Sequence, residues 1–293
     1  MLLFIHGSGA TNSLWIPQIR GIFSFEDQDI SDRYLLDLFT ISLPGHSKDD
    51  KYFEAQDVAR AIELLVPEKR EKQLELADKL IFSNNKEAVN ALKSPKVFLI
   101  GHSIGGVVAL NYTFRNLNLV EKIVLVSCAF DFDNIGINIT SFFCNQLLFR
   151  VKPKYIQSFQ HKTSNIRLKT LFSICLENPD RKALRSCTKI CREYSFASIY
   201  KLLSLEEQLK FSKIPILGVG GYSDRLVSAS SFKKLKKYLN KQDKLLSTKK
   251  TLIQEQQTTP LNNFIYKLYP TGHHPMDDQR LWFIQDVRDF LAT

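Results

Sequence analysis

Residues 96–112 read KVFLIGHSIGGVVALNY, and this stretch decides the fold class. Its first apolar run is typical of a buried strand, and the run after the glycines is typical of a helix that packs on a sheet. Between them, Ser103 is flanked by Gly101 and Gly105, which let the chain turn sharply and pass close to itself. The pattern predicts a strand, a tight turn that exposes a serine, and a helix. The alternative is that Ser103 only caps the helix.

Five other short apolar runs are spaced along the chain, with longer helical patterns between them. They are residues 1–6, 34–43, 122–128, 214–220 and 264–269. Because these runs are nearly continuous rather than alternating, they suit strands that helices cover on both faces. The sequence therefore predicts an α/β fold with a mostly parallel central sheet flanked by helices.

Three segments are longer than ordinary connections between strands and helices. Residues 131–213 separate two strands and carry many aromatic side chains, which predicts a helical cap, or lid, over the sheet. Residues 67–95 predict a helical insertion, and the polar residues 240–263 predict a loop insertion. The sheet-forming core then consists of residues 1–130 and 214–293.

The net charge of +10 over 293 residues makes nucleic acid or an acidic membrane surface the first partners to consider. The excess is local, because residues 131–213 and 233–250 each carry a net charge of +7. On a helix through the second segment, Phe232, Leu235 and Leu239 would face the sheet and the lysines would face solvent. Aromatic residues do not alternate with these lysines, so no nucleic-acid partner is expected. The predicted cap would lie over the mouth of the predicted pocket, so its positive charge would favour an anionic substrate.

Five cysteines in a chain of this size argue against a disulfide framework and for a reducing compartment. Cys187 and Cys191 would share a helix face, but a zinc site needs two more ligands nearby, so no metal is expected. The N-terminal stretch MLLFIHG is too short for a signal peptide, and no run reaches the ~18 apolar residues of a membrane span. The sequence predicts a cytoplasmic protein with no integral membrane association.

Residues suited to acyl chemistry follow several of the predicted strands. Ser103 follows the third strand, Asp224 lies just beyond the fifth, and His273 lies just beyond the sixth. After the first strand, the turn HGSG would aim the backbone N–H of Ser8 at an oxyanion, opposite the N–H of Ile104. Because the carboxyl ends of parallel strands meet at one edge of a sheet, we expect these groups to lie together.

Together these motifs resemble the α/β-hydrolase superfamily, in particular its capped, esterase-like serine members. The quoted motifs are HGSGATNSLW, LPGHS, GHSIGG, GGYSDRLV and TGHHPMDD. The resemblance implies that Ser103 is the nucleophile, Asp224 the acid and His273 the base of a catalytic triad. It also implies that the amides of Ser8 and Ile104 form the oxyanion hole.

The same resemblance places Gly101 and Gly105 in the nucleophile elbow. The sequence departs from the family pattern in three places. Ser42 precedes LPGHS where an aspartate is usual, and no hairpin precedes the first strand, so the sheet is shorter at that edge or the chain starts upstream. In addition, His273 stands 49 positions after Asp224, a long spacing that is largely due to the polar insertion.

Several residues compete for the predicted roles. His274 is an alternative base, although His273 is favoured because it directly follows a glycine. Asp131 and Asp133 follow the fourth strand and are alternative acids, although the GGYSDRLV context favours Asp224. The other histidines near the predicted site are interpreted as structural hydrogen-bonding groups, namely His6, His46 and His102.

The reading that follows is a hydrolase of carboxylic esters that acts on a small acyl substrate through an acyl-enzyme intermediate. It requires neither a metal nor an organic cofactor. Thioesterase, acyltransferase and C–C hydrolase activities use the same groups and remain open, because the cap would set the acyl specificity. A ligand receptor without enzymatic activity is a further alternative on this fold. The oligomeric state is not predicted.

Overall fold

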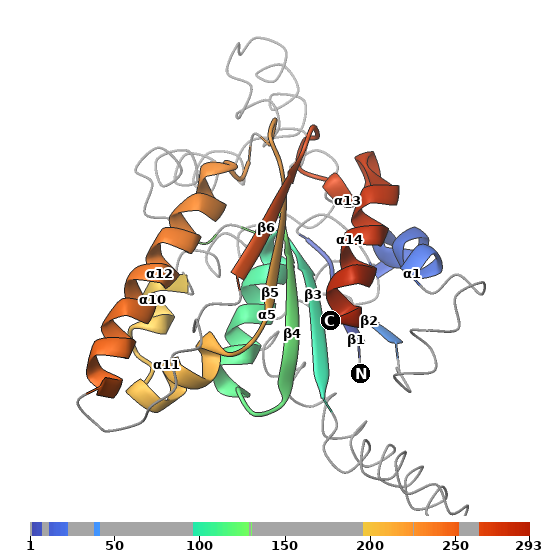
Figure 1. Cartoon of the computed structure of the whole chain (residues 1–293). Coiled ribbons are helices and arrows are strands. Elements are labelled where there is room, and N and C mark those ends of the chain that lie inside the picture. Colours follow the sequence, from blue (N-terminus) through green and yellow to red (C-terminus); the bar gives the residue numbers. More distant parts are fainter. Residues whose placement is uncertain are drawn as a thin grey trace, which may run out of the picture.

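Six parallel strands form the central sheet, in the order β2-β1-β3-β4-β5-β6 (Figure 1). They are β1 (Leu2–Ile5), β2 (Leu38–Ile41), β3 (Val97–His102), β4 (Val120–Val126), β5 (Ile216–Gly221) and β6 (Phe264–Tyr269). Every neighbouring pair of strands is parallel. All six predicted runs therefore contain strands, and the predicted α/β fold class is confirmed.

The computed structural model describes a defined set of residues. These are residues 2–7, 12–22, 38–41, 96–128, 130, 196–224, 226–251 and 264–293. The predicted helical insertion at 67–95 lies outside them, as do residues 131–195 of the predicted cap. The division of the chain into core and cap therefore stays a prediction.

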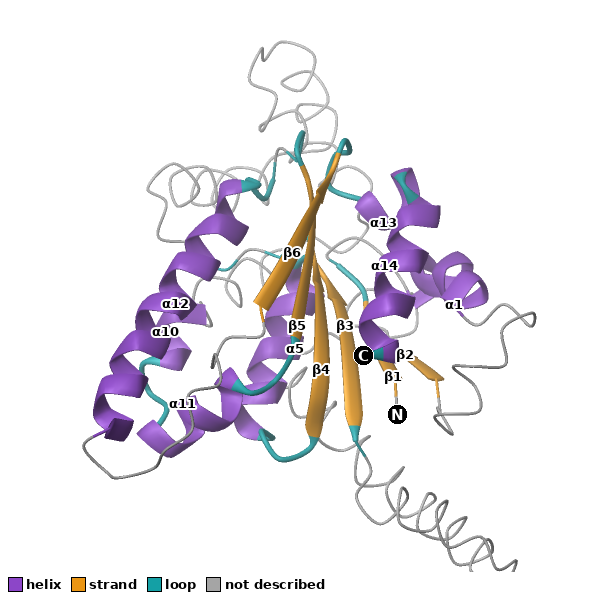
Figure 2. Ribbon diagram, viewed as in Figure 1, coloured by secondary structure: helices purple, strands orange, loops and turns teal. Residues whose placement is uncertain are grey.

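Helices cover both faces of the sheet (Figure 2). One face carries α5 (Ile104–Arg115), α10 (Phe196–Tyr200), α11 (Leu205–Ser212) and α12 (Ser230–Thr251). The other face carries the 3-10 helix η1 (Asn12–Trp15), α1 (Ile16–Ile22), α13 (Pro275–Asp278) and α14 (Arg280–Ala292). Side chains of β1 alternate between these layers, because Leu3 and Ile5 pack with the α5 side and Leu2 and Phe4 with the α14 side. Burial on both faces explains why the strands are almost wholly apolar.

Helix α12 is longer than the sequence indicates, because it continues to Thr251. The predicted polar loop at 240–263 is therefore wrong over its first part, and residues 252–263 lie outside the described residues. Up to Thr251 this segment contains neither Gly nor Pro, and it includes four lysines and two leucines, which favour helix.

The two sides of α12 are as predicted. Phe232, Leu235 and Leu239 are buried, at 1%, 3% and 5% exposure. The lysines between them are exposed. The apolar side therefore docks the helix on the sheet, and the lysines are solvated.

The described end of the predicted cap packs on the face of the sheet. Helices α10 and α11 bring Phe196, Tyr200 and Phe211 against Phe114 of α5. The ring centroid of Phe114 lies 5.6 Å from that of Phe196 and 4.9 Å from that of Phe211. These helices therefore extend the hydrophobic core beside α5, and α11 leads directly into β5.

The C-terminal helix α14 buries one face against the sheet. Phe283, Val287, Phe290 and Leu291 are buried there, whereas Leu281 is 79% exposed. These buried positions recur at helical spacing, so one side of α14 packs on the sheet.

Candidate active site

Ser103 occupies a strained turn between β3 and α5. Its φ is 53° and its ψ is −117°, in a region that residues other than glycine rarely adopt. The Ser103 N–H donates to the carbonyl of Val126 on β4 at 2.8 Å, which ties the turn to the neighbouring strand. Such strain persists only where the surrounding structure holds it, and it is common at functional sites.

Two glycines let the chain pass close to itself around Ser103. A Cβ at Gly101 would come within 2.5 Å of the Gly105 carbonyl oxygen. A Cβ at Gly105 would overlap the carbonyl oxygens of Ile5 and His6 at the end of β1. Any side chain at these two positions would therefore force the backbone apart.

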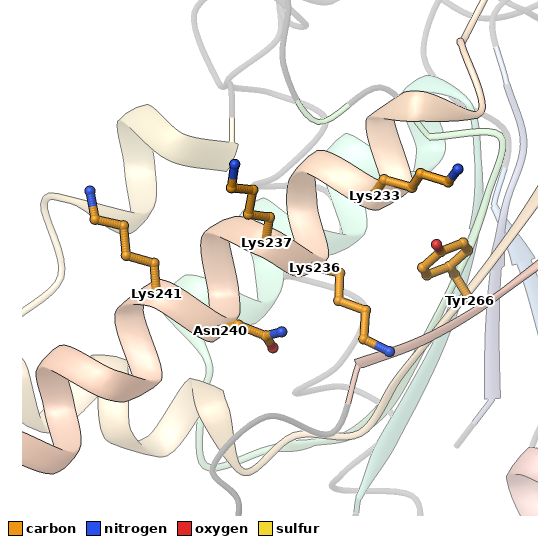
Figure 3. A pocket seen from close by; sticks show the side chains of 6 residues that line it. All are labelled: Lys233, Lys236, Lys237, Asn240, Lys241 and Tyr266. Atoms are coloured by element: carbon orange, nitrogen blue, oxygen red, sulfur yellow. The ribbon is translucent and has the colours of Figure 1, made fainter.

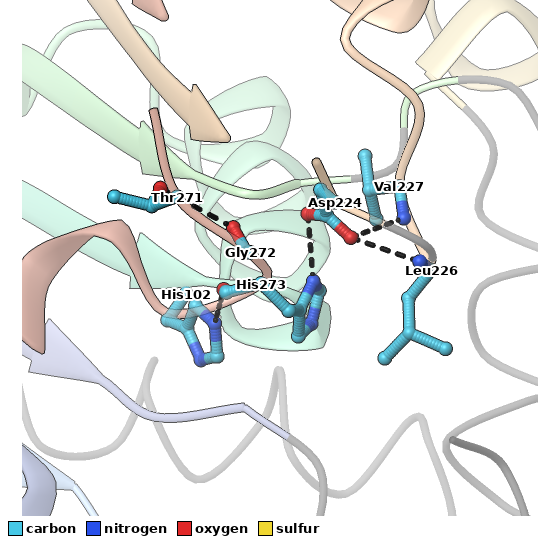
Figure 4. A network of polar contacts seen from close by, with 7 residues as sticks. All are labelled: His102, Asp224, Leu226, Val227, Thr271, Gly272 and His273. Atoms are coloured by element: carbon cyan, nitrogen blue, oxygen red, sulfur yellow. Dashed lines mark hydrogen bonds and ion pairs between the residues drawn. The ribbon is translucent and has the colours of Figure 1, made fainter. Parts of the chain in front are cut away.

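The predicted acid and base lie side by side beyond the ends of β5 and β6 (Figure 4). His273 Nδ1 lies 2.9 Å from Asp224 Oδ2 and, since a carboxylate only accepts, the imidazole donates. The Asp224 side chain is 1% exposed and that of His273 is 13% exposed. With its proton on Nδ1, the neutral imidazole keeps Nε2 free to accept another proton.

Backbone amides hold the other oxygen of the Asp224 carboxylate. Oδ1 accepts hydrogen bonds from the N–H groups of Leu226 at 2.8 Å and Val227 at 2.9 Å. The turn after Asp224 thus folds its own amides back onto the side chain. A buried carboxylate needs such donors to offset the loss of water, and they fix its orientation towards His273.

His102 fits its interpretation as a structural group. It is 2% exposed, and its Nε2 lies 3.0 Å from the carbonyl oxygen of His273. Its ring centroid lies 5.0 Å from that of His273 and 4.8 Å from that of His274. Sequence reasoning missed this link, because the two residues are 171 positions apart and nothing in the motif indicates the contact.

In the described residues, the predicted nucleophile and the predicted base are not hydrogen-bonded to one another. Within the residues that the structure describes, the side chain of Ser103 makes no hydrogen bond with the ring of His273. His102 links their two segments, because it adjoins Ser103 in the chain and contacts His273. Hydrogen bonds between a nucleophile and its base are often long or poorly aligned without substrate, so the lack of one here does not argue against proton transfer.

The predicted oxyanion amides are only partly described. Ile104 is the first residue of α5, and the N–H groups of a first helical turn have no partner within the helix. Ser8 lies outside the described residues. Its neighbour Gly7 lies beside the elbow, because a Cβ at Gly7 would come within 3.1 Å of the Ser103 Cβ. Gly7, just after β1, therefore lies on the side of Ser103 opposite β4.

The alternative acids and bases differ in position. His274 is next to the site, but its Nδ1 lies 3.9 Å from Asp277 Oδ2 rather than against Asp224. Burial, and then the neighbouring His273, lowers the pKa of His274. Asp131 and Asp133 lie outside the described residues, as does His46.

A basic groove between α12 and β6 is separate from the predicted site (Figure 3). It has a volume of about 500 Å³ and is lined by Lys233, Lys236, Lys237, Asn240, Lys241 and Tyr266. Lys236 Nζ lies 5.8 Å from the centroid of the Tyr266 ring. None of the predicted site residues lines this groove.

No metal site or membrane span is found in the part of the chain that the structure describes. There, no group of three or more His, Cys, Asp or Glu side chains is arranged to hold a metal ion. No described helix is both long and apolar enough to cross a membrane. Cys128 is a buried free thiol whose pKa is raised by burial, and the other four cysteines lie outside the described residues.

The parallel sheet and the serine elbow at its carboxyl edge together define an α/β hydrolase fold. The sequence model of the alpha/beta hydrolase family matches residues 2–285, and the chain belongs to this family. No protein with a curated description matches the chain.

Solved structures share the fold at low identity. A bromoperoxidase from Bacillus anthracis has a TM-score of 0.61 at 15% identity, covering 100% of this chain and 91% of that one. An esterase from Exiguobacterium antarcticum has a TM-score of 0.54 at 13% identity, covering 100% and 91%. A meta-cleavage product hydrolase from Pseudomonas fluorescens has a TM-score of 0.53 at 14% identity, covering 99% and 89%. At these identities the likeness shows the fold alone.

Proposed function

We propose that this chain is a serine hydrolase that cleaves the carboxylic ester of a small acyl substrate. The observation that carries the proposal is the 2.9 Å hydrogen bond from His273 to the buried Asp224. It orients an imidazole at the same edge of the sheet as the strained turn of Ser103. A serine hydroxyl is a weak nucleophile, and it needs an oriented base beside it and a turn that exposes it, in addition to donors for the oxyanion.

In the proposed reaction, His273 Nε2 takes the proton of Ser103 Oγ as that oxygen attacks the acyl carbon. Asp224 keeps the proton of His273 on Nδ1 and stabilises the imidazolium that forms. The amides of Ile104 and Ser8 hold the negative oxygen of the tetrahedral intermediate. The imidazolium then protonates the departing alcohol, and a water molecule repeats the sequence to release the acid.

Labelling with a fluorophosphonate tests the nucleophile, together with turnover of p-nitrophenyl esters. We expect one covalent label per chain, and we expect Ser103→Ala to abolish both labelling and turnover. Ser127 provides a control, because it too has a positive φ, of 45°, just after a strand, but its side chain is buried whereas that of Ser103 is partly exposed. The Ser127→Ala variant should still label, whereas a wild-type chain that never labels would favour a ligand receptor.

Turnover of other substrates separates activities that share these groups. A series of acyl esters and thioesters of increasing chain length identifies the leaving group and the acyl preference. Diversion of product to an added alcohol would identify an acyltransferase. The proposed preference for anionic substrates rests on the charge of residues 131–213, and it predicts faster hydrolysis of anionic than of neutral esters at low ionic strength.

A further inference from the structure

His102 links two loops that are distant in the sheet. It ends β3, while His273 follows β6, and β4 and β5 lie between these strands. The bond from the His102 ring to the His273 carbonyl spans this distance (Figure 4). The loop that carries the predicted base is thereby tied to the turn that carries the predicted nucleophile.

The direction of this hydrogen bond follows from the charge state of His102. Burial lowers the pKa of His102 well below its ordinary value, and the neighbouring His273 and His274 lower it further. A neutral imidazole has only one N–H group, and a carbonyl oxygen can only accept. The proton therefore lies on Nε2, which donates to His273.

The opposite nitrogen of His102 faces Gly7, just after β1. Nδ1 has no hydrogen-bond partner among the described residues. A Cβ on Gly7 would come within 2.5 Å of this nitrogen, so the backbone of Gly7 packs directly against it. One buried ring thus lies between the turn of Gly7, the elbow of Ser103 and the loop of His273.

We infer that His102 is a positioning residue, which holds the backbone of His273 over the serine elbow by donating its Nε2–H to the His273 carbonyl. This inference rests on the proposed function. His102 touches neither the acyl group nor the transferred proton in the proposed mechanism, so its loss should change how often the base is aligned rather than how tightly substrate binds. A misplacement of about 1 Å in a catalytic group can cost on the order of 100-fold in rate.

Three substitutions at this position separate the hydrogen bond from the bulk of the ring. His102→Phe keeps an aromatic ring and removes the donor. His102→Gln keeps a donor, because its amide nitrogen is as many bonds from Cα as Nε2 of histidine. His102→Asn also carries an amide, but one bond shorter, so it should not reach the His273 carbonyl.

Steady-state kinetics on a p-nitrophenyl ester give the readout, with thermal melting to establish that each variant is folded. We expect His102→Phe and His102→Asn to lower kcat by about 10- to 100-fold with KM within about threefold. His102→Gln should recover most of the lost kcat. His274→Phe is the matched control, because it removes another imidazole from the same cluster, and its kcat should stay within about threefold of wild type.

The outcomes distinguish this inference from the proposed function. If Ser103→Ala abolishes turnover but a folded His102→Phe keeps the wild-type kcat, the positioning role is wrong and the hydrolase proposal stands. Equal losses of kcat in the Gln, Asn and Phe variants would also overturn the positioning role. The loss would then not depend on whether residue 102 can donate a hydrogen bond to the His273 carbonyl. If Ser103→Ala retains turnover, the proposed function itself fails.

Discussion

The carboxyl edge of the sheet and the helix α12 hold their polar groups in opposite ways. At the edge, Asp224 and His102 are almost fully buried and bonded to groups from other segments. On α12, Lys233, Lys237 and Lys241 are exposed and make no ion pair or hydrogen bond among the described residues. Burying a polar group is costly unless it is bonded, so a buried and bonded group has a defined position. The lysines dominate the local charge, but the groove that they line contains none of the predicted site residues.

The largest expected effect is at the buried edge. Asp224→Asn keeps the shape of the side chain but removes the acceptor that holds the His273 proton on Nδ1. An analogous change in a serine triad costs on the order of 10⁴-fold in kcat, and we expect a loss of that size here. The measurement is kcat on a p-nitrophenyl ester, with circular dichroism to establish the fold.

Asp286→Asn provides the control for losing a bonded carboxylate elsewhere. Asp286 accepts a 2.6 Å hydrogen bond from the hydroxyl of Tyr269 and pairs with Lys267, away from the serine elbow. The kcat of the Asp286→Asn variant should stay within about threefold of wild type. If the two variants lost kcat to a similar extent, the loss would not depend on the position of Asp224 beside His273. The predicted catalytic role of Asp224 would then be wrong.

Much of this edge could be predicted from the sequence, because local patterns encode it. Apolar runs indicate the strands, and Ser103, Asp224 and His273 each stand just after one. Parallel strands then require these residues to share an edge. The contact between Asp224 and His273 follows from that rule, and the structure brings the two side chains to 2.9 Å.

The parts that could not be predicted depend on contacts between distant segments or on weak local preferences. The bond of His102 to the His273 carbonyl has no local signal, because a histidine beside the serine is equally compatible with a solvent-facing ring. The end of α12 was mispredicted because a polar, lysine-rich composition suits an exposed helix as well as a loop. Composition indicates exposure there but does not decide the backbone conformation.

The second prediction concerns what holds α12 in place. Phe232 is 1% exposed, packs edge-on against Phe130 at 5.3 Å, and stacks on Tyr266 at 6.1 Å. It also fills the space over Gly218 and Gly220, where any Cβ would strike its ring. Phe232→Ala should lower the free energy of unfolding by about 3–5 kcal/mol, as measured by urea denaturation.

A neighbouring lysine provides the comparison on the same helix. Lys236→Ala removes only a solvated side chain above Tyr266 and should change the free energy of unfolding by at most about 0.5 kcal/mol. Below their denaturation midpoints, both variants should keep the wild-type kcat. Phe232 packs on Phe130 and Tyr266, and Lys236 lines a groove that includes none of the predicted site residues. A large loss of kcat in the folded Phe232→Ala variant would instead show that the packing of α12 affects the predicted active site.

The third prediction, with a smaller expected effect than the first two, concerns the removal of charge from α12. Lys233, Lys237 and Lys241 are spaced four residues apart, and like charges at this spacing repel by about 0.2–0.5 kcal/mol per pair. Glutamine has nearly the same helix propensity as lysine, so replacing all three by Gln should raise the free energy of unfolding by roughly 0.4–1 kcal/mol at low salt. In ~1 M salt the gain should vanish, because the Debye length falls to about 3 Å.

A gain that persists at high salt would contradict the electrostatic cause. A fall in kcat would show that these lysines do act on the chemistry, and the division between buried edge and solvated helix would then be wrong.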